Sequence, residues 1–213
     1  KCNKQYYDMN REEVEGILAG NISFTIMNYY IHHLSLQYKE QVWKGITTDP
    51  KTLMLGPEIL GSQHEKSAST SFLKNLTKRY SLPFEKGHNT YLLMFDLFNR
   101  ILLPICTAEH FSLVEINCSD KNQYKILIYD LSLSILTETD TKSSHAEDLK
   151  LLQDYIAFEV NDKCKDAELA SKYLSRFPTA WTAAININAT QIESNPKGGM
   201  IQLLLLMKSV FED

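Results

Sequence analysis

The sequence lacks a long apolar segment, a signal peptide and an excess of basic charge. Its longest apolar run, from Met200 to Met207, contains a Gln and falls well short of the roughly 20 residues that cross a bilayer. The 22 basic residues are outnumbered by 26 acidic ones, which gives a net charge of −4, and they are spread along the chain. We therefore expect neither a membrane segment nor a nucleic-acid-binding surface.

Paired cysteines are also missing. The four cysteines, Cys2, Cys106, Cys118 and Cys164, form no CxxC pair and have no histidine at ligand spacing. This pattern predicts neither a zinc site nor a disulfide framework, and it favours a reducing compartment. We expect no metal and no cofactor.

The length and apolar content suit one compact domain. The chain has 213 residues, 44% of them hydrophobic, which is enough for one substantial core and too little for two. We expect a single domain over residues 1–213. Because the sequence begins at Lys1 and not at Met, we also expect it to be part of a longer protein.

The apolar periodicity predicts helices, then a block of strands, then helices with one late strand. This order is typical of an α+β fold. Residues 47–70 show no clear period. The helices are expected at residues 10–18, 23–38, 71–80, 145–158, 166–177 and 200–211, and the strands at 91–95, 100–105, 111–118, 124–131 and 181–189.

One histidine and one aspartate lie at the open end of a predicted hairpin. The turn at residues 119–122 joins two apolar strands. In an antiparallel hairpin the residue numbers of each facing pair add to the same total, which is about 240 to 242 for this turn. His110 and Asp130 sum to 240 and are therefore expected side by side. A carboxylate that orients an imidazole is part of a nucleophilic triad.

Other interpretations of this pair stay open. Glu109 and Asp96 are rival carboxylates, although the hairpin geometry does not favour either. A histidine before a strand and an aspartate at the end of the next are, in most proteins, surface residues. That interpretation predicts that His110 and Asp130 do not touch.

Two segments resemble the cysteine proteases that are specific for SUMO and other ubiquitin-like proteins. His110-Phe111-Ser112-Leu113 with Ile128-Tyr129-Asp130-Leu131-Ser132 is similar to the family's His-Trp-x-Leu and Tyr-x-Asp-Ser. Residues 25–34, TIMNYYIHHL, resemble the helix that opens the family's catalytic domain. The resemblance implies a papain-like α+β fold, of the ubiquitin-like protease and adenain type, with a central mixed sheet flanked by helices.

The nucleophile of that family is absent. The family places a Trp in the last strand, then an oxyanion-binding Gln, then Asp-Cys-Gly at the start of a helix; Trp181 matches the first of these. Counting forward without gaps puts Ser194 at the Gln and Met200 at the Cys, and a shift of one residue puts Gly199 there instead. A thioether has no ionisable proton and cannot form the attacking thiolate.

The other cysteines near this pair are poor substitutes. Cys118 lies eight residues beyond His110, more than about 20 Å along an extended strand. Cys106 is expected in a loop before the histidine, packed as a small apolar residue.

The resemblance then implies a pseudoprotease with His110 and Asp130 as remnants. Its function is expected to be protein binding or scaffolding, with SUMO or another ubiquitin-like protein as the partner, in the nucleus or cytoplasm. Phe111 and Trp181 are expected to line the channel for the partner's Gly-Gly tail. The alternative is an active hydrolase that uses His110 and Asp130 with an unrecognised nucleophile.

Overall fold

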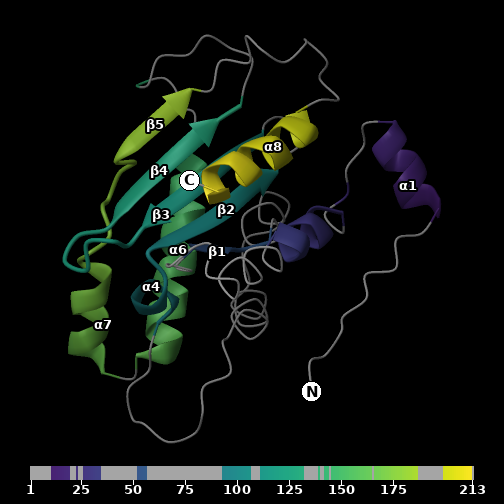
Figure 1. Ribbon diagram of the computed structural model, residues 1–213. Helices are drawn as coiled ribbons and strands as arrows, with labels where there is room; N and C mark the ends of the chain where they lie inside the picture. The colour runs from purple at the N-terminus through teal and green to yellow at the C-terminus, as the bar shows by residue number, and fades with distance from the viewer. Residues whose placement is uncertain are drawn as a thin grey trace, which may run out of the picture.

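A mixed five-stranded sheet forms the centre of the protein (Figure 1). The computed structural model describes residues 11–19, 23, 26–34, 52–56, 93–106, 111–131, 139, 142–143, 145–164, 166–186 and 199–212. The strands follow the order β1-β2-β3-β4-β5 across the sheet, and the outer pairs are parallel while the inner pairs are antiparallel. Their bounds are Thr52–Met54, Arg100–Cys106, Phe111–Asn117, Lys125–Asp130 and Ala183–Asn186.

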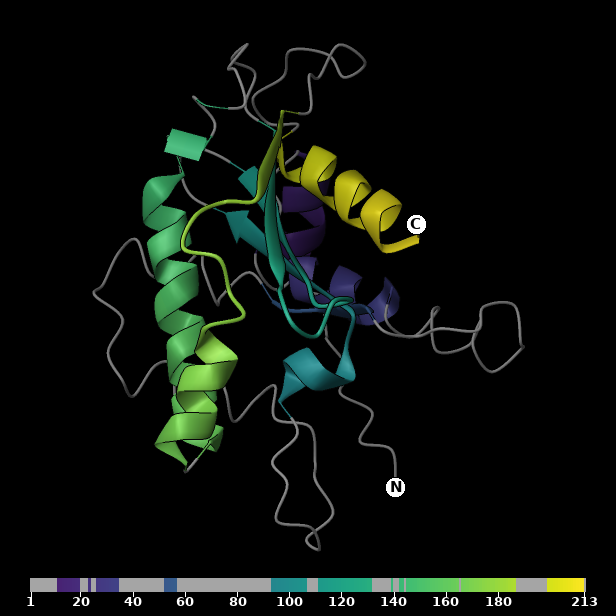
Figure 2. The same cartoon turned by 90° about the vertical axis from the view of Figure 1, so that its left-hand side faces the viewer.

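Helices cover both faces of the sheet (Figure 2). Helices α6 and α7 lie on one face, and α8 and the helix at residues 26–34 lie on the other. Helices α1 and α4 and the helical residues 139 and 142–143 complete the described set. The bounds of the labelled helices are Arg11–Leu18 for α1, Met94–Leu97 for α4, Ala146–Lys163 for α6, Ala167–Leu174 for α7 and Gly199–Glu212 for α8. The α+β class and the mixed sheet flanked by helices are confirmed.

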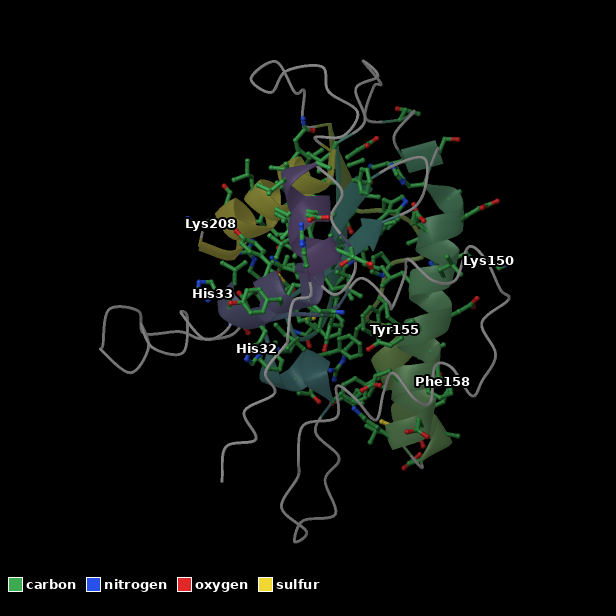
Figure 3. The ribbon with its side chains drawn as sticks, turned by 90° about the vertical axis from the view of Figure 1, so that its right-hand side faces the viewer. His32, His33, Lys150, Tyr155, Phe158 and Lys208 are labelled. Carbon is green, nitrogen blue, oxygen red and sulfur yellow. The ribbon has the colours of Figure 1, made fainter. Side chains whose placement is uncertain are left out.

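Period-two alternation divides the apolar side chains of the sheet into two cores. On β4, Ile126 and Ile128 face α6, where they pack with Leu152 and Tyr155. Figure 3 shows Tyr155 pointing from α6 toward the sheet, with Lys150 on the outer side of the helix. The opposite face of the sheet packs against α8 and the helix at residues 26–34, through Met27, Ile31, Leu34, Leu102, Leu113, Leu203 and Met207.

The structure corrects several expected elements. The strand expected at residues 91–95 is wrong, because residues 94–97 form the short helix α4. The Asp96 carboxylate accepts a hydrogen bond from the Leu93 amide at 3.3 Å, so the side chain caps this helix at its start. Short strand β1 lies inside the region without clear period. The helix expected at residues 71–80 lies outside the described residues.

The remaining elements agree with the pattern to within a few residues. Helix α6 extends to Lys163, and β5 begins at Ala183 instead of Trp181. Helix α8 is buried on one side only, since Ile201 and Leu205 are 43% and 54% exposed while Leu203 and Met207 are fully buried. No helix in the described part of the chain has the length and apolar character needed to span a membrane.

The two sides of α8 allow a matched stability test. We expect Leu203→Ala to lower the free energy of unfolding by about 2 to 5 kcal/mol, because Leu203 is fully buried between α8 and the sheet. The control, Leu205→Ala, removes the same atoms from the exposed side of the helix and is expected to change it by about 0.5 kcal/mol or less. Urea denaturation measures both, and equal losses would contradict the packing of α8.

Candidate functional site

Asp130 ends strand β4 and is almost completely buried, with 1% of its surface exposed. It follows Ile126 and Ile128 in the alternation, so its side chain faces α6. In the register of the sheet, Ser112 of β3 lies opposite it on one side and Asn186 of β5 on the other. A buried carboxylate requires compensating donors or charges, because burial without them is costly.

The register confirms the predicted hairpin, since Ser112 and Asp130 give a sum of 242. His110 precedes Ser112 by two residues and lies outside the described residues, as does Glu109. The contact between His110 and Asp130 therefore stays a prediction.

A different histidine contacts Asp130. His145 lies immediately before α6, and its Nε2 is 3.3 Å from Oδ2 of Asp130. The other ring nitrogen, Nδ1, is 2.7 Å from Oδ2 of Asp148, in the first turn of α6. His145 is 3% exposed and Asp148 2% exposed, so the three side chains form a buried acid–imidazole–acid triad.

The triad favours a charged imidazole. Burial acts to lower the pKa of His145, but hydrogen bonds to Asp130 and Asp148 and the attraction of both carboxylates outweigh it and raise the pKa from 6.5 to about 9. At neutral pH the imidazolium donates a hydrogen bond from each ring nitrogen to a carboxylate. Such a ring holds no lone pair that could take up a further proton.

Trp181 connects this triad to the segment before β5. Its indole Nε1–H donates a hydrogen bond to the backbone carbonyl of His145 at 3.2 Å, and the side chain is 4% exposed. Phe111, at the start of β3, is half-buried and packs against the core on the α8 face. Trp181 belongs to the core on the α6 face. The structure thus places the two predicted channel residues on opposite faces of the sheet.

The expected nucleophile positions open helix α8. Gly199 is its first residue and Met200 its second, and Ser194 lies outside the described residues. Figures 1 and 2 show that this end of α8 lies at the same end of the sheet as the last residues of β4 and β5. Helix α8 packs on the face opposite to α6, whereas the Asp130 side chain faces α6. The carboxylate and the start of α8 therefore share an end of the sheet but not a face.

Two of the four cysteines are buried free thiols. Cys118 lies next to the hairpin turn, at the other end of the sheet from Asp130, and burial raises the pKa of its thiol to about 12. Burial also raises the pKa of Cys164, directly after α6. Both thiols are therefore protonated at neutral pH. In the described ranges, no three His, Cys, Asp or Glu side chains are grouped to hold a metal ion.

The position of Cys106 differs from the prediction. Instead of lying in a loop, it is the last residue of β2 and pairs in register with Phe111 of β3. Its backbone is therefore at the same end of the sheet as Asp130 and the start of α8.

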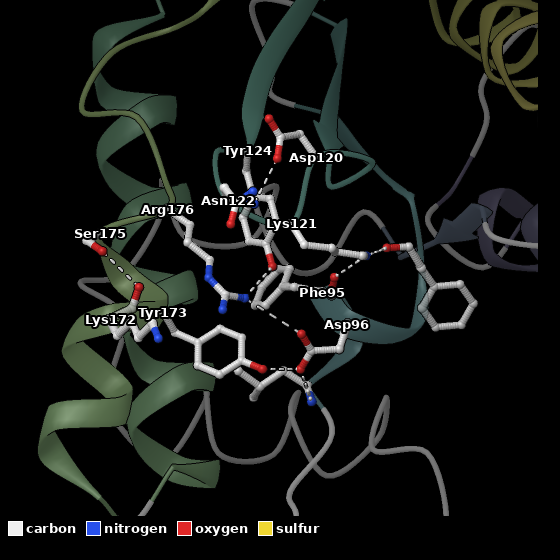
Figure 4. Close-up of polar contacts among 12 residues, drawn as sticks. Phe95, Asp96, Asp120, Lys121, Asn122, Tyr124, Lys172, Tyr173, Ser175 and Arg176 are labelled. Carbon is white, nitrogen blue, oxygen red and sulfur yellow. Dashed lines mark hydrogen bonds and ion pairs between the residues drawn. The ribbon is translucent and has the colours of Figure 1, made fainter.

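Asp96, the rival carboxylate, belongs to a separate cluster beside the hairpin turn (Figure 4). The Tyr173 hydroxyl of α7 donates a hydrogen bond to its Oδ2, and Arg176 lies 3.8 Å from Oδ1. Arg176 also donates to the Tyr124 hydroxyl and stacks on the Tyr173 ring. Lys121, in the turn, donates to the Phe95 carbonyl at 3.0 Å. These contacts join α4, α7 and the hairpin, which is a structural role.

The sequence interpretation did not include His145 or Asp148. Their spacing of three residues at the start of a helix was a usable signal, because it places both side chains on one turn. The proximity of His145 to Asp130 depends on how α6 packs on the sheet, and local sequence gives no signal for that.

The structure is similar to that of a solved de-sumoylating protease. A de-sumoylating protease superposes with a TM-score of 0.60 at 13% sequence identity, over 96% of this chain and 68% of that one. The effector protein XopD of Xanthomonas campestris, solved bound to ubiquitin, gives 0.42 at 10% identity, over 84% of this chain and 72% of that one. No protein-family model matches the chain, and neither does any curated protein sequence. The protein has the fold of the de-sumoylating protease, the papain-like fold that its sequence predicts.

We expect the stability of the protein to fall as the pH rises from about 6.5 to 9. The folded state binds a proton at His145 more tightly than the unfolded state, because its pKa is raised to about 9. The stabilisation is complete below pH 6.5 and is lost as the pH passes 9, by up to about 3 kcal/mol. Denaturant unfolding at several pH values measures it, and a profile that rises between pH 6.5 and 9 would contradict the charged triad.

Proposed function

We propose that this protein is a catalytically inactive relative of the de-sumoylating proteases that binds a ubiquitin-like protein without cutting it. The observation that carries the proposal is the start of α8. In a chain with this protease fold, the helix that would carry the nucleophile begins Gly199-Met200-Ile201 and contains no thiol.

The chemistry of the described residues supports this proposal. Peptide hydrolysis by this route requires a thiol and a neutral imidazole that accepts its proton, which leaves the attacking thiolate. A thioether at Met200 cannot supply the first. Among the described residues, the imidazole that contacts Asp130 is that of His145, which is charged at neutral pH and cannot supply the second.

A protease fold that lacks a nucleophile can still bind a partner protein. A protein that recognises its partner through a broad surface does not need a nucleophile to hold it. Phe111, half-buried at the end of β3 nearest the start of α8, is the aromatic residue we place at the partner's C-terminal tail. We assign the protein to the nucleus or cytoplasm, where ubiquitin-like modifiers act.

A binding titration tests the proposal. We expect micromolar affinity for at least one mature ubiquitin-like protein in a panel, and loss of that affinity when its terminal Gly-Gly is removed. Isothermal titration calorimetry measures both. The absence of binding to every member would contradict the proposal and point to a scaffold that uses another surface.

A matched pair of variants locates the surface. We expect Phe111→Ala to weaken the binding by about tenfold or more, as for an aromatic contact at the centre of an interface. The control is Phe158→Ala on α6, a half-buried phenylalanine on the other face of the sheet. Equal weakening by both variants would mean that the loss reflects folding and not contact.

The position of Cys106 supports a second candidate, the hydrolase with an unrecognised nucleophile. Its strand ends beside Phe111, at the same end of the sheet as Asp130. If this thiol reacts, a ubiquitin-like protein that carries a C-terminal electrophile forms a covalent adduct with the wild type and none with Cys106→Ser. We expect no adduct with either, as read by mass spectrometry of the intact protein, with Cys118→Ser as the control for a buried thiol.

A further inference from the structure

The buried triad joins three parts of the fold. Asp130 is the last residue of β4, and Asp148 is in the first turn of α6. His145 lies between them, 3.3 Å and 2.7 Å from one oxygen of each carboxylate. The carbonyl of the same histidine accepts the indole N–H of Trp181, which precedes β5. One residue therefore contacts the sheet, the helix and the segment that leads to the edge strand.

The charges within the triad attract one another, because a carboxylate faces each nitrogen of the imidazolium. Among the described residues, the charged groups that face the imidazole are Asp130 from β4 and Asp148 from α6. Ser112 on β3 and Trp181 before β5 contribute neutral groups. All three charged side chains are at most 3% exposed, so water and salt screen their attraction only weakly. A charged ring between two carboxylates leaves one net negative charge.

We propose that Asp130 is held in an ionic latch with His145 and Asp148, and that this latch serves to fix α6 and the segment before β5 to the sheet. His145 and Asp148 are then positioning residues. A carboxylate with this task is needed for folding, whether or not a nucleophile is present. The latch does not depend on the binding of any partner.

Alternative uses of the triad fit the geometry less well. A general base must have a free lone pair and access to its substrate, but both ring nitrogens of His145 contact carboxylates and the ring is 3% exposed. A metal ion would have to displace the imidazole from both carboxylates. The described side chains offer no group of three ligands for such an ion.

A double-mutant cycle on the full chain tests the latch. We expect His145→Gln to lower the folding equilibrium constant by on the order of a hundredfold to a thousandfold, because it removes the cation that contacts both buried carboxylates. Asp130→Asn is expected to lower it as well. The loss in the double variant should be smaller than the product of the two single effects, because the Asp130 side chain that loses the imidazolium is then neutral and only Asp148 still loses its cation. The proposal would be overturned if the fold-change in the double variant equalled the product of the two single fold-changes, or if Asp130→Asn left the folding equilibrium constant unchanged.

Two control variants separate the latch from general damage. Ser112→Ala changes a buried residue directly opposite Asp130 whose hydroxyl has no hydrogen-bond partner among the described residues, and we expect little change in stability. Asp154→Asn removes an exposed carboxylate from the same helix as Asp148, and it is also expected to be neutral. A loss in either control as large as that of Asp130→Asn would overturn the specific role of the triad.

Nuclear magnetic resonance of the histidine rings provides a measurement on the wild type that does not depend on whether the variants fold. One ring, assigned to His145 by its disappearance in any folded His145 variant or by sequential assignment, should remain protonated at both nitrogens up to a pKa of about 9. In Asp148→Asn its pKa should fall. If all six histidines titrate between about pH 6 and 7, the latch is overturned. These outcomes are independent of whether the protein binds a ubiquitin-like partner.

Discussion

The antiparallel pairing of β3 with β4 is the interaction on which the rest of the structure depends. These two strands occupy the middle of the sheet, and their short connection fixes the register at Ser112 opposite Asp130. Because side chains alternate along each strand, this register decides which residues face α6 and which face α8. A shift of one residue would turn Ile126 and Ile128 away from their core and would bring Asp130 to the α8 face.

The same register places buried charge on both faces of the pair. On the α8 face, the Glu115 carboxylate accepts hydrogen bonds from the Arg100 guanidinium and from the Tyr129 hydroxyl. On the α6 face, Asp130 contacts His145. Each carboxylate has a cation from a neighbouring element, so burial of the charge is compensated in each case. Such pairs stabilise one arrangement of the elements, because any other packing would leave a charge alone.

Much of the fold was predictable because its signals are local. The period of the apolar residues located α6, α7 and α8, and the turn at residues 119–122 predicted the hairpin and its register. The short helix α4 was not predictable in this way. Three of its four residues are apolar, as in a buried strand. The hydrogen bond from the Leu93 amide to the Asp96 carboxylate caps the segment and favours a helix. The partner of Asp130 was missed for a different reason, since His145 and Asp130 meet only through the packing of α6 on the sheet.

A buried carboxylate that contacts a buried cation is costly to replace, whether or not the protein is a catalyst. Asp130 ends β4 and is almost completely buried, so its replacement by an apolar residue must also remove the charges that face it. Here those charges come from α6, which buries the apolar side chains of half the sheet. His145 and Asp148 therefore make Asp130 difficult to replace on physical grounds alone. The presence of Asp130 at the end of β4 is therefore no evidence of activity by itself.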